Sequence, residues 1–307
     1  SPMVAEYRTW ITAQYNTPID PPQANNVAQA LLNDARRACD RIESGIDSLA
    51  DPQVLEAFRM ANRVVAIARR RQLSQELNQP PESFKPPAWR PFQLAFILLN
   101  LVSIAQPDCF DRGFVDLLFF PTGGGKTEAY LGLAAFTLVL RRLKHPGIQS
   151  AGMSVLMRYT LRLLTLDQLE RAARLICALE LERKNDPTKK LDEWPFEIGL
   201  WVGQGATPNK LGKRGDKDEC SARERTLAFK RDSKGKPSPI PLEKCPWCGE
   251  KFKPESFQLQ PTEDAPKNLK VICTNRDYFG RDCDFRSRNP YRSWQSMNPS
   301  TVAYPAS

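Results

Sequence analysis

The chain has 307 residues, of which 41% are hydrophobic and 26% charged, a composition typical of a soluble globular protein with a sizeable core. No run of 18 or more consecutive apolar residues occurs, so we expect no membrane span, and the N-terminus has no pattern of a signal peptide. The 44 basic and 35 acidic residues give a net charge of +9, which favours a polyanionic partner such as nucleic acid, although a basic solvated surface would give the same number.

The first 88 residues are expected to form an N-terminal helical domain followed by a proline-rich linker. Residues 1–24 contain several prolines and are expected to be irregular. Apolar residues at helical spacing across 25–78, with a second helix beginning at Asp51-Pro52, predict an antiparallel pair of helices. The segment 79–91 is rich in proline and marks the linker.

Strands and helices are predicted to alternate from Pro91 onward, which indicates an α/β fold with a parallel sheet and right-handed crossovers. The predicted helices cover about 93–104, 126–143 and 166–183, and the predicted strands cover 114–120, 154–158 and 197–202. The remainder, residues 204–307, is predicted to hold a basic loop, a cysteine-rich insertion and an irregular tail.

The clearest motif is Phe-Phe-Pro-Thr-Gly-Gly-Gly-Lys-Thr-Glu-Ala-Tyr at residues 119–130. Glycines let successive backbone N–H groups point at phosphate oxygens, and the start of the following helix favours an anion. We call residues 122–127 the phosphate loop, with Thr122, Gly123, Gly124 and Gly125 as its predicted backbone donors. Lys126 would bind the β- and γ-phosphates of ATP, and the Thr127 hydroxyl would ligate Mg²⁺.

The phosphate loop departs from the general pattern because Phe120 stands where the opening glycine is expected. The form Pro-Thr-Gly-Gly-Gly-Lys-Thr resembles the superfamily 2 helicases, which commonly lack that glycine. The upstream segment Trp-Arg-Pro-Phe-Gln-Leu-Ala at 89–95 resembles the adenine-reading motif of the same enzymes. The resemblance implies that Gln93 binds adenine and that 89–203 is an incomplete first RecA-like lobe; an ordinary glutamine at a helix start is the alternative.

A strand followed by a turn and a helix at 154–172 lies where these helicases contact nucleic acid. By this resemblance Arg158, Thr160 and Arg162 are candidate DNA contacts, since Arg and Thr at a strand end can bind phosphate oxygens. The usual Pro-Thr pair of the family is absent, and the leucines of this segment are better explained by helix packing.

Residues 89–290 together resemble one branch, the DrmA family, the helicase-like component of the DISARM anti-phage defence system. This resemblance implies a DNA-acting ATPase that works with a second protein, DrmB. The Asp-Glu pair that should follow an apolar strand is missing, because Asp192-Glu193 and Asp218-Glu219 lie in polar sequence. The second lobe is missing too, so we expect this chain to be an N-terminal portion with poor activity by itself.

The cysteines Cys245, Cys248, Cys273 and Cys283 form a predicted metal site. The two-residue gap in Cys-Pro-Trp-Cys is typical of a zinc ribbon, and four thiolates favour a structural Zn²⁺, with an iron–sulfur cluster or unligated thiols as alternatives. Cys220 is a possible substitute ligand. An ATP motif indicates a reducing, cytoplasmic setting, which favours metal binding over disulfides. Basic and aromatic residues around the cluster suit either nucleic acid or a docked protein.

Two functional interpretations remain open at this point. One is a DNA helicase or translocase, and the other is a nucleotide-sensing, zinc-containing scaffold that binds DNA or a protein without motor activity. A phosphate-loop kinase explains neither Gln93 nor the cysteines.

Overall fold

The computed structural model describes the chain except residues 21, 122, 160–161, 203–206, 209, 217, 277–281 and 287–307, and it does not describe the side chains of residues 22 and 162–165. The described residues form two compact units that interleave along the sequence. Unit 1 comprises residues 1–67, 85–156 and 182–194, and unit 2 comprises residues 68–84, 157–181 and 195–307.

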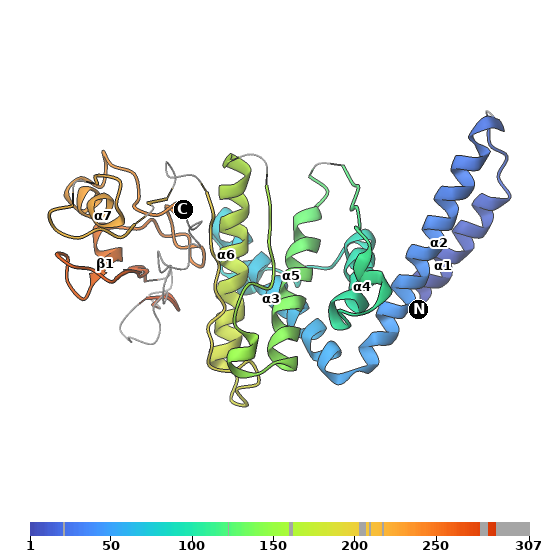
Figure 1. Ribbon diagram of the computed structural model, residues 1–307, viewed down its shortest axis with the longest axis horizontal. Helices are drawn as coiled ribbons and strands as arrows, with labels where there is room; N and C mark the ends of the chain where they lie inside the picture. Colours follow the sequence, from blue (N-terminus) through green and yellow to red (C-terminus); the bar gives the residue numbers. More distant parts are fainter. Residues whose placement is uncertain are drawn as a thin grey trace. The chain divides into compact units, whose positions relative to one another are not determined.

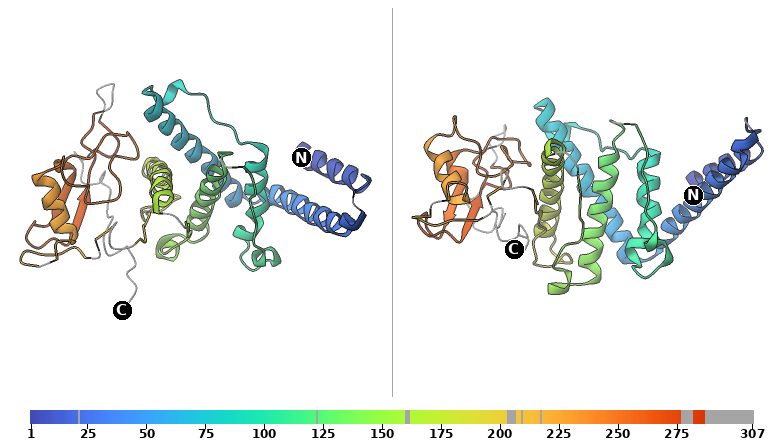
Figure 2. Two further views of the ribbon diagram at one scale, coloured as in Figure 1. Left: turned by 90° about the horizontal axis from the view of Figure 1, so that it is seen from above. Right: turned by 45° about the horizontal axis from the view of Figure 1, so that its top comes forward.

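Helices make up nearly all of the regular structure (Figures 1 and 2). The α-helices are α1 (Pro2–Tyr15), α2 (Asn25–Asp47), α3 (Pro52–Leu77), α4 (Pro91–Ala105), α5 (Lys126–Lys144), α6 (Arg162–Asn185) and α7 (Ala222–Arg231). Short 3₁₀ helices are η1 (Pro22–Ala24), η2 (Ser48–Ala50), η3 (Pro81–Ser83), η4 (Phe110–Gly113), η5 (Gly147–Ser150) and η6 (Pro254–Ser256). None of the described helices combines the length and apolarity needed to cross a bilayer.

Unit 1 is built around α2, which packs against both α1 and α4, while α4 also packs against α5 (Figure 1). The α1–α2 hairpin is closed by an ion pair between Arg8 Nη2 and Asp40 Oδ1 at 3.0 Å. Arg41 of α2 binds Asp116 at 2.6 Å and Asp111 at 3.2 Å. These two pairs attach the segment after α4 to α2.

The helix α1 replaces the irregular N-terminus that the prolines suggested. Pro2 lies in the first turn of α1, where its missing N–H costs nothing because that group has no partner within a helix. Val4 and Ile11 are buried on one face, 3% and 2% exposed. Proline content therefore misled the prediction because the position of the proline, and not its presence, decides whether a helix forms.

The helices expected at 93–104, 126–143 and 166–183 are confirmed by α4, α5 and α6. The RecA-like parallel sheet is not shown, because 114–120, 154–158 and 197–202 contain no strand. Side chains in the first of these segments lie open to solvent, with Val115 97%, Leu117 86% and Phe119 88% exposed. A parallel strand needs hydrogen-bonded neighbours on its edges, and the described residues supply none there.

Unit 2 contains the sheet that is present among the described residues, an antiparallel hairpin of β1 (Phe257–Gln260) and β2 (Asn268–Val271). Phe257 pairs with Val271 and Leu259 with Leu269, and all four side chains are buried. Phe257 packs edge-on against Phe229 of α7, with ring centroids 5.5 Å apart. The hairpin and α7 thus share a small core beside the cysteine-rich segment.

Candidate functional site

The phosphate loop joins an extended segment to the start of α5. Gly123 and Gly125 both have positive φ, 79° and 87°, and Gly125 directly precedes the first residue of the helix. The N–H of Gly124 donates to Pro121 O at 3.1 Å. The Lys126 ammonium donates back to Phe120 O and, at 3.2 Å, to Pro121 O. The loop therefore curls around its own lysine at the N-terminus of α5.

The segment at the start of α4 binds two consecutive carbonyls of this loop. Arg90 Nη1 donates to Gly124 O at 2.8 Å, and Gln93 Nε2 donates to Gly125 O at 2.7 Å. Gln93 is 5% exposed, and its Oε1 accepts from the backbone N–H of Arg90 at 2.8 Å. Both ends of the Gln93 amide are therefore engaged, and each end keeps a second N–H or lone pair for a further partner.

Two aromatic residues of the same segment complete the attachment. Phe92 stacks on Phe120 with ring centroids 3.9 Å apart and an interplanar angle of 11°. Trp89 donates to Asn62 of α3 and lies against Gly132 of α5, where an added Cβ would come within 2.9 Å of the indole. The sequence motif at 89–93 thus contacts both the phosphate loop and the helix that follows it.

The geometry around Gly123 and the start of α5 fits an anion. Gly123 is exposed, and no heavy atom of the described residues outside its chain neighbours lies within 4 Å of the position of an added Cβ. Gly125 offers no side-chain cap to α5, so the first N–H groups of the helix remain oriented for an anion. Lys126 and Thr127 are half-buried in this loop, and Thr122 lies outside the described residues.

The predicted nucleic-acid contacts are only partly described. Arg158 is exposed in a segment without regular structure, Thr160 lies outside the described residues, and Arg162 begins α6 with its side chain not described.

Asp192 of the polar pair Asp192-Glu193 accepts hydrogen bonds from nearby backbone N–H groups. Asp192 has a φ of 65°, and hydrogen bonds from the N–H groups of Glu193 and Gly147 lower the pKa of its carboxyl group.

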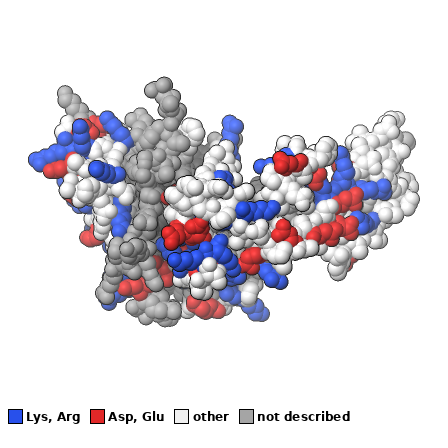
Figure 3. All heavy atoms as spheres, turned by 60° about the horizontal axis from the view of Figure 1, so that its bottom comes forward, with Lys and Arg blue, Asp and Glu red and all other residues white. Residues whose placement is uncertain are grey.

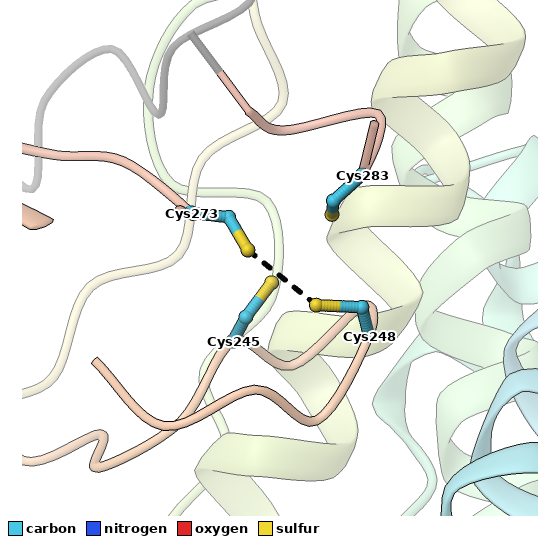
Figure 4. Close-up of side chains that lie close together, drawn as sticks. All are labelled: Cys245, Cys248, Cys273 and Cys283. Atoms are coloured by element: carbon cyan, nitrogen blue, oxygen red, sulfur yellow. Dashed lines mark hydrogen bonds between the residues drawn. The ribbon is translucent and has the colours of Figure 1, made fainter. Parts of the chain in front are cut away.

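The four predicted metal ligands come together in unit 2. One sulfur atom from each of Cys245, Cys248, Cys273 and Cys283 lies within 4.8 Å of all the others, and the side chains face one another (Figure 4). Cys248 Sγ and Cys273 Sγ are 3.4 Å apart, and all four cysteines are free thiols. Cys220, the possible substitute, is exposed and is not part of this cluster.

Backbone hydrogen bonds shape the two halves of the cysteine cluster. In the first half the N–H of Cys245 donates to Glu250 O and the N–H of Gly249 donates to Cys245 O, both at 2.8 Å. Gly249 has a φ of 79°, which glycine adopts without strain. In the second half the N–H of Cys283 donates to Asn275 O at 3.2 Å. The first half is therefore a turn that carries Cys245 and Cys248, and in the second half a backbone hydrogen bond joins Cys283 to the segment after Cys273.

Three of the four cysteines are buried, Cys248 is partly exposed, and the thiols interact. Cys245, Cys273 and Cys283 are 0%, 1% and 6% exposed. Hydrogen bonds with the other three cysteines, that with Cys245 first, lower the pKa of Cys248. Asn275 adds N–H donors to Cys273 Sγ at 3.4 Å and to Cys248 Sγ at 3.7 Å. Such N–H···S contacts stabilise thiolates, the form that binds a metal.

The donor set fits a tetrahedral metal ion. Zinc–sulfur bonds of about 2.3 Å place the sulfurs of a tetrahedron about 3.8 Å apart, and the four sulfurs here lie within 4.8 Å of one another. Four protein thiols leave no position for water or substrate, which is the arrangement of a structural site. The prediction that these cysteines converge is confirmed.

Three residues near these sites were not identified from the sequence. Arg90 and Phe92 contact the phosphate loop, although only Gln93 was singled out in that motif. Arg174 binds the cysteine turn from α6. The spacing of a local motif could not have revealed Arg174, because this residue lies 72 positions from its partner Pro246.

The fold and these sites define a class of protein. It is rich in helices, a glycine-rich loop opens one of its helices, and four of its cysteines are arranged for a metal ion. No protein-family model matches the chain. It is 36% identical over 286 residues to the DISARM protein DrmA of Bacillus paralicheniformis, an alignment that covers 89% of this chain and 25% of that protein. The chain is therefore DrmA-like, as its motifs indicated, and it spans about a quarter of the length of this curated relative.

Proposed function

We propose that this chain is the ATP-binding portion of a DrmA-type superfamily 2 DNA helicase or translocase, acting in the bacterial cytoplasm in anti-phage defence. The observation that carries the proposal is the attachment of the 89–93 motif to the phosphate loop. Arg90 and Gln93 bind the carbonyls of Gly124 and Gly125, so two segments that resemble helicase motifs meet at one place.

In this proposal the triphosphate binds above Gly123 at the N-terminus of α5. Lys126 would leave Phe120 O and Pro121 O for the β- and γ-phosphate oxygens, since an ionised phosphate is a stronger partner for an ammonium than a carbonyl. Mg²⁺, bound beside Thr127, would neutralise the phosphate charge. Gln93 would bind adenine, or hold the loop in the shape that adenine binding requires.

The proposed motor needs structure that this stretch does not supply. The exposed Val115, Leu117 and Phe119 precede the loop, as expected of a strand that enters a RecA-like sheet with further strands of a longer protein. DNA would bind near Arg158, Thr160 and Arg162, and DrmB would be the protein partner. On the face shown in Figure 3, basic and acidic side chains are interspersed, so DNA binding is proposed from the motif and not from one basic patch.

We further propose that the cysteine cluster holds a structural Zn²⁺. Four thiols without a nearby histidine ligand select zinc over harder cations, and a closed site supplies folding energy instead of chemistry. The cluster lies in unit 2, whereas the phosphate loop lies in unit 1.

The proposal is tested by Mg-ATP binding and by DNA-stimulated ATP hydrolysis, measured for this chain and for the full-length protein that contains it. Lys126→Ala is expected to lower hydrolysis by the full-length protein about 10²–10³-fold, the effect of removing one donor to developing negative charge. Lys85→Ala is the matched control, because Lys85 is exposed and lies outside the loop.

Stimulated hydrolysis that disappears with Lys126→Ala and persists with Lys85→Ala supports the motor. ATP binding without hydrolysis, even in the full-length protein, would support the nucleotide-sensing scaffold. Absence of nucleotide binding in both proteins would overturn the proposal as a whole.

A further inference from the structure

The first cysteine turn is bound on both sides of Cys245 by α6. Glu170 and Arg174 lie one helical turn apart on this helix. Lys244 Nζ lies 3.2 Å from Glu170 Oε1, and Arg174 Nε donates to Pro246 O at 3.0 Å. Lys244 and Pro246 flank Cys245, so α6 contacts a side chain on one side of the first thiol and a backbone carbonyl on the other.

The end of α3 binds the same carbonyl. Gln75 Nε2 donates to Pro246 O at 3.0 Å, and Gln75 Oε1 accepts from Arg174 Nη2 at 3.1 Å. One turn earlier, the Arg71 guanidinium lies 4.6 Å from the centroid of the Trp247 ring. Pro246 O is therefore the point at which α3, α6 and the cysteine turn are hydrogen-bonded together within unit 2.

The second half of the cysteine cluster is included through Trp247. Its Nε1 donates to Asp284 Oδ2 at 2.8 Å, and Asp284 is the neighbour of Cys283 in sequence. Arg71 Nη2 lies 3.8 Å from the same carboxylate oxygen. Trp247, next to Cys248, and Asp284, next to Cys283, thus connect both halves of the cluster to Arg71 of α3.

Arg174 is the buried centre of these contacts. The residue is 4% exposed, and burial lowers the pKa of its guanidinium, which nevertheless stays protonated in proteins. Glu170 Oε1, 2.8 Å from Nη2, neutralises part of the charge. Four thiolates around a divalent cation carry a net negative charge, which favours a guanidinium bonded to the same turn.

We propose that Arg174 is a positioning residue for the metal site, and that through Pro246 O it couples metal loading to the linkage between α3 and α6. A loaded site fixes Cys245 and Cys248 and therefore the carbonyl between them. A fixed carbonyl holds Arg174 and Gln75 in one arrangement, and this arrangement joins the two helices. Loss of the metal would release the carbonyl and with it the end of α3. This inference rests on the proposed metal site and goes beyond it.

The test uses the full chain and four variants. Arg174→Met removes the donors and the charge, and Arg174→Lys restores the charge with one donor group. Gln75→Met removes the second donor to Pro246 O and one acceptor of Arg174, and it leaves Arg174 paired with Glu170. Arg59→Met is the control, since Arg59 is an exposed arginine of α3. Zinc release to a chromophoric chelator, the absorption spectrum of the Co²⁺ form, and amide hydrogen exchange of residues 68–77 are measured.

Arg174→Met is expected to release zinc about 10–100-fold faster than the control, the range found when groups that orient metal ligands are removed. The Co²⁺ spectrum should still report four thiolates, because no ligand is changed. Arg174→Lys should release zinc more slowly than Arg174→Met. The release rate of Gln75→Met should lie between those of Arg174→Met and the Arg59→Met control. Chelation should raise exchange across 68–77 in the unmodified chain, and Arg174→Met should show raised exchange with zinc still bound.

Two results would overturn the coupling. One is a rate of zinc release in both Arg174→Met and Gln75→Met that lies within about twofold of the rate in Arg59→Met. The other is an amide hydrogen exchange rate across residues 68–77 that does not change when zinc is removed by a chelator. If Arg174→Met does not fold, Gln75→Met decides the matter by the same readouts. A chain that binds neither Zn²⁺ nor Co²⁺ refutes the metal site itself, whereas bound metal with unaltered release refutes the role of Arg174 alone.

Discussion

The phosphate loop and the first cysteine turn both contain glycine at positive φ, yet the surroundings of the two sites differ in how complete they are. Around the cluster, Cys245 and Phe257 are 0% and 1% exposed, and side chains of α3 and α6 bind its backbone. Before the loop, Val115 and Phe119 are 97% and 88% exposed. One site is enclosed by residues of this chain, and the other has an open side.

The difference follows from what each site needs. A structural metal site needs a few thiols within bonding distance of one ion, and one short segment with its supporting helices can supply them. A nucleotide site at a strand–loop–helix junction needs the strand to be held in a sheet, and its neighbours can come from distant sequence. Among the described residues, Arg90, Phe92 and Gln93 bind the loop or the segment before it.

The largest expected effect comes from removing a metal ligand. Cys273→Ser should lower bound zinc from one per chain to none, and the segment 243–273 should become sensitive to protease, because binding of structural zinc contributes about 10–16 kcal/mol in small zinc domains. Nucleotide binding at the phosphate loop should be unchanged if the cluster is self-contained.

Metal analysis and limited proteolysis measure this, with Cys220→Ser as the control because Cys220 is exposed and outside the cluster. Full zinc content in Cys273→Ser, or loss of zinc in Cys220→Ser, would contradict the ligand assignment.

A smaller effect is expected from matched glycine substitutions in the two turns. Gly125→Ala and Gly249→Ala place an L side chain at φ values of 87° and 79°, which costs about 1–2 kcal/mol. The Cβ added at Gly125 would lie 2.7 Å from Gln93 Nε2, and the Cβ added at Gly249 would lie 3.1 Å from Gln75 Cγ. Gly125→Ala should therefore weaken ATP binding, and Gly249→Ala should speed zinc release.

Denaturant unfolding, ATP binding and zinc release distinguish these two variants. Gly113→Ala is the control, because no described atom lies within 4 Å of its added Cβ and its φ is not positive. Faster zinc release in Gly125→Ala, or weaker ATP binding in Gly249→Ala, would contradict the independence of the two sites.

The smallest expected effect is that of Trp247→Phe. The phenyl ring would keep the contact with Arg71, but the hydrogen bond from Nε1 to Asp284, 2.8 Å long, would be lost at a cost of about 0.5–1.5 kcal/mol. Thermal unfolding of the zinc-loaded chain measures it, with the exposed Trp201→Phe as the control. A loss as large as that of Cys273→Ser would mean that Trp247 does more than orient the second half of the cluster.

Local patterns in the sequence predicted three helices and the convergence of four cysteines. The helices α4, α5 and α6 were found from apolar spacing, and the four cysteines from the spacing of thiols. The helix α7 was missed, although Ser221 and Glu224 give a capping signal, and Ser221 Oγ accepts from the Glu224 N–H at 3.3 Å. The β1–β2 hairpin was missed as well, although buried Phe257, Leu259, Leu269 and Val271 alternate as in a strand.

The sequence alone determined that a glycine-rich loop opens α5 and that four cysteines can share one metal, because both features depend on residue types at short spacing. Only the tertiary structure decided which side chains bind those turns. Arg90, Gln93, Arg174 and Gln75 reach their partners across 32 to 171 positions of sequence. Such contacts depend on how helices are placed in space, and local periodicity carries no information about that placement.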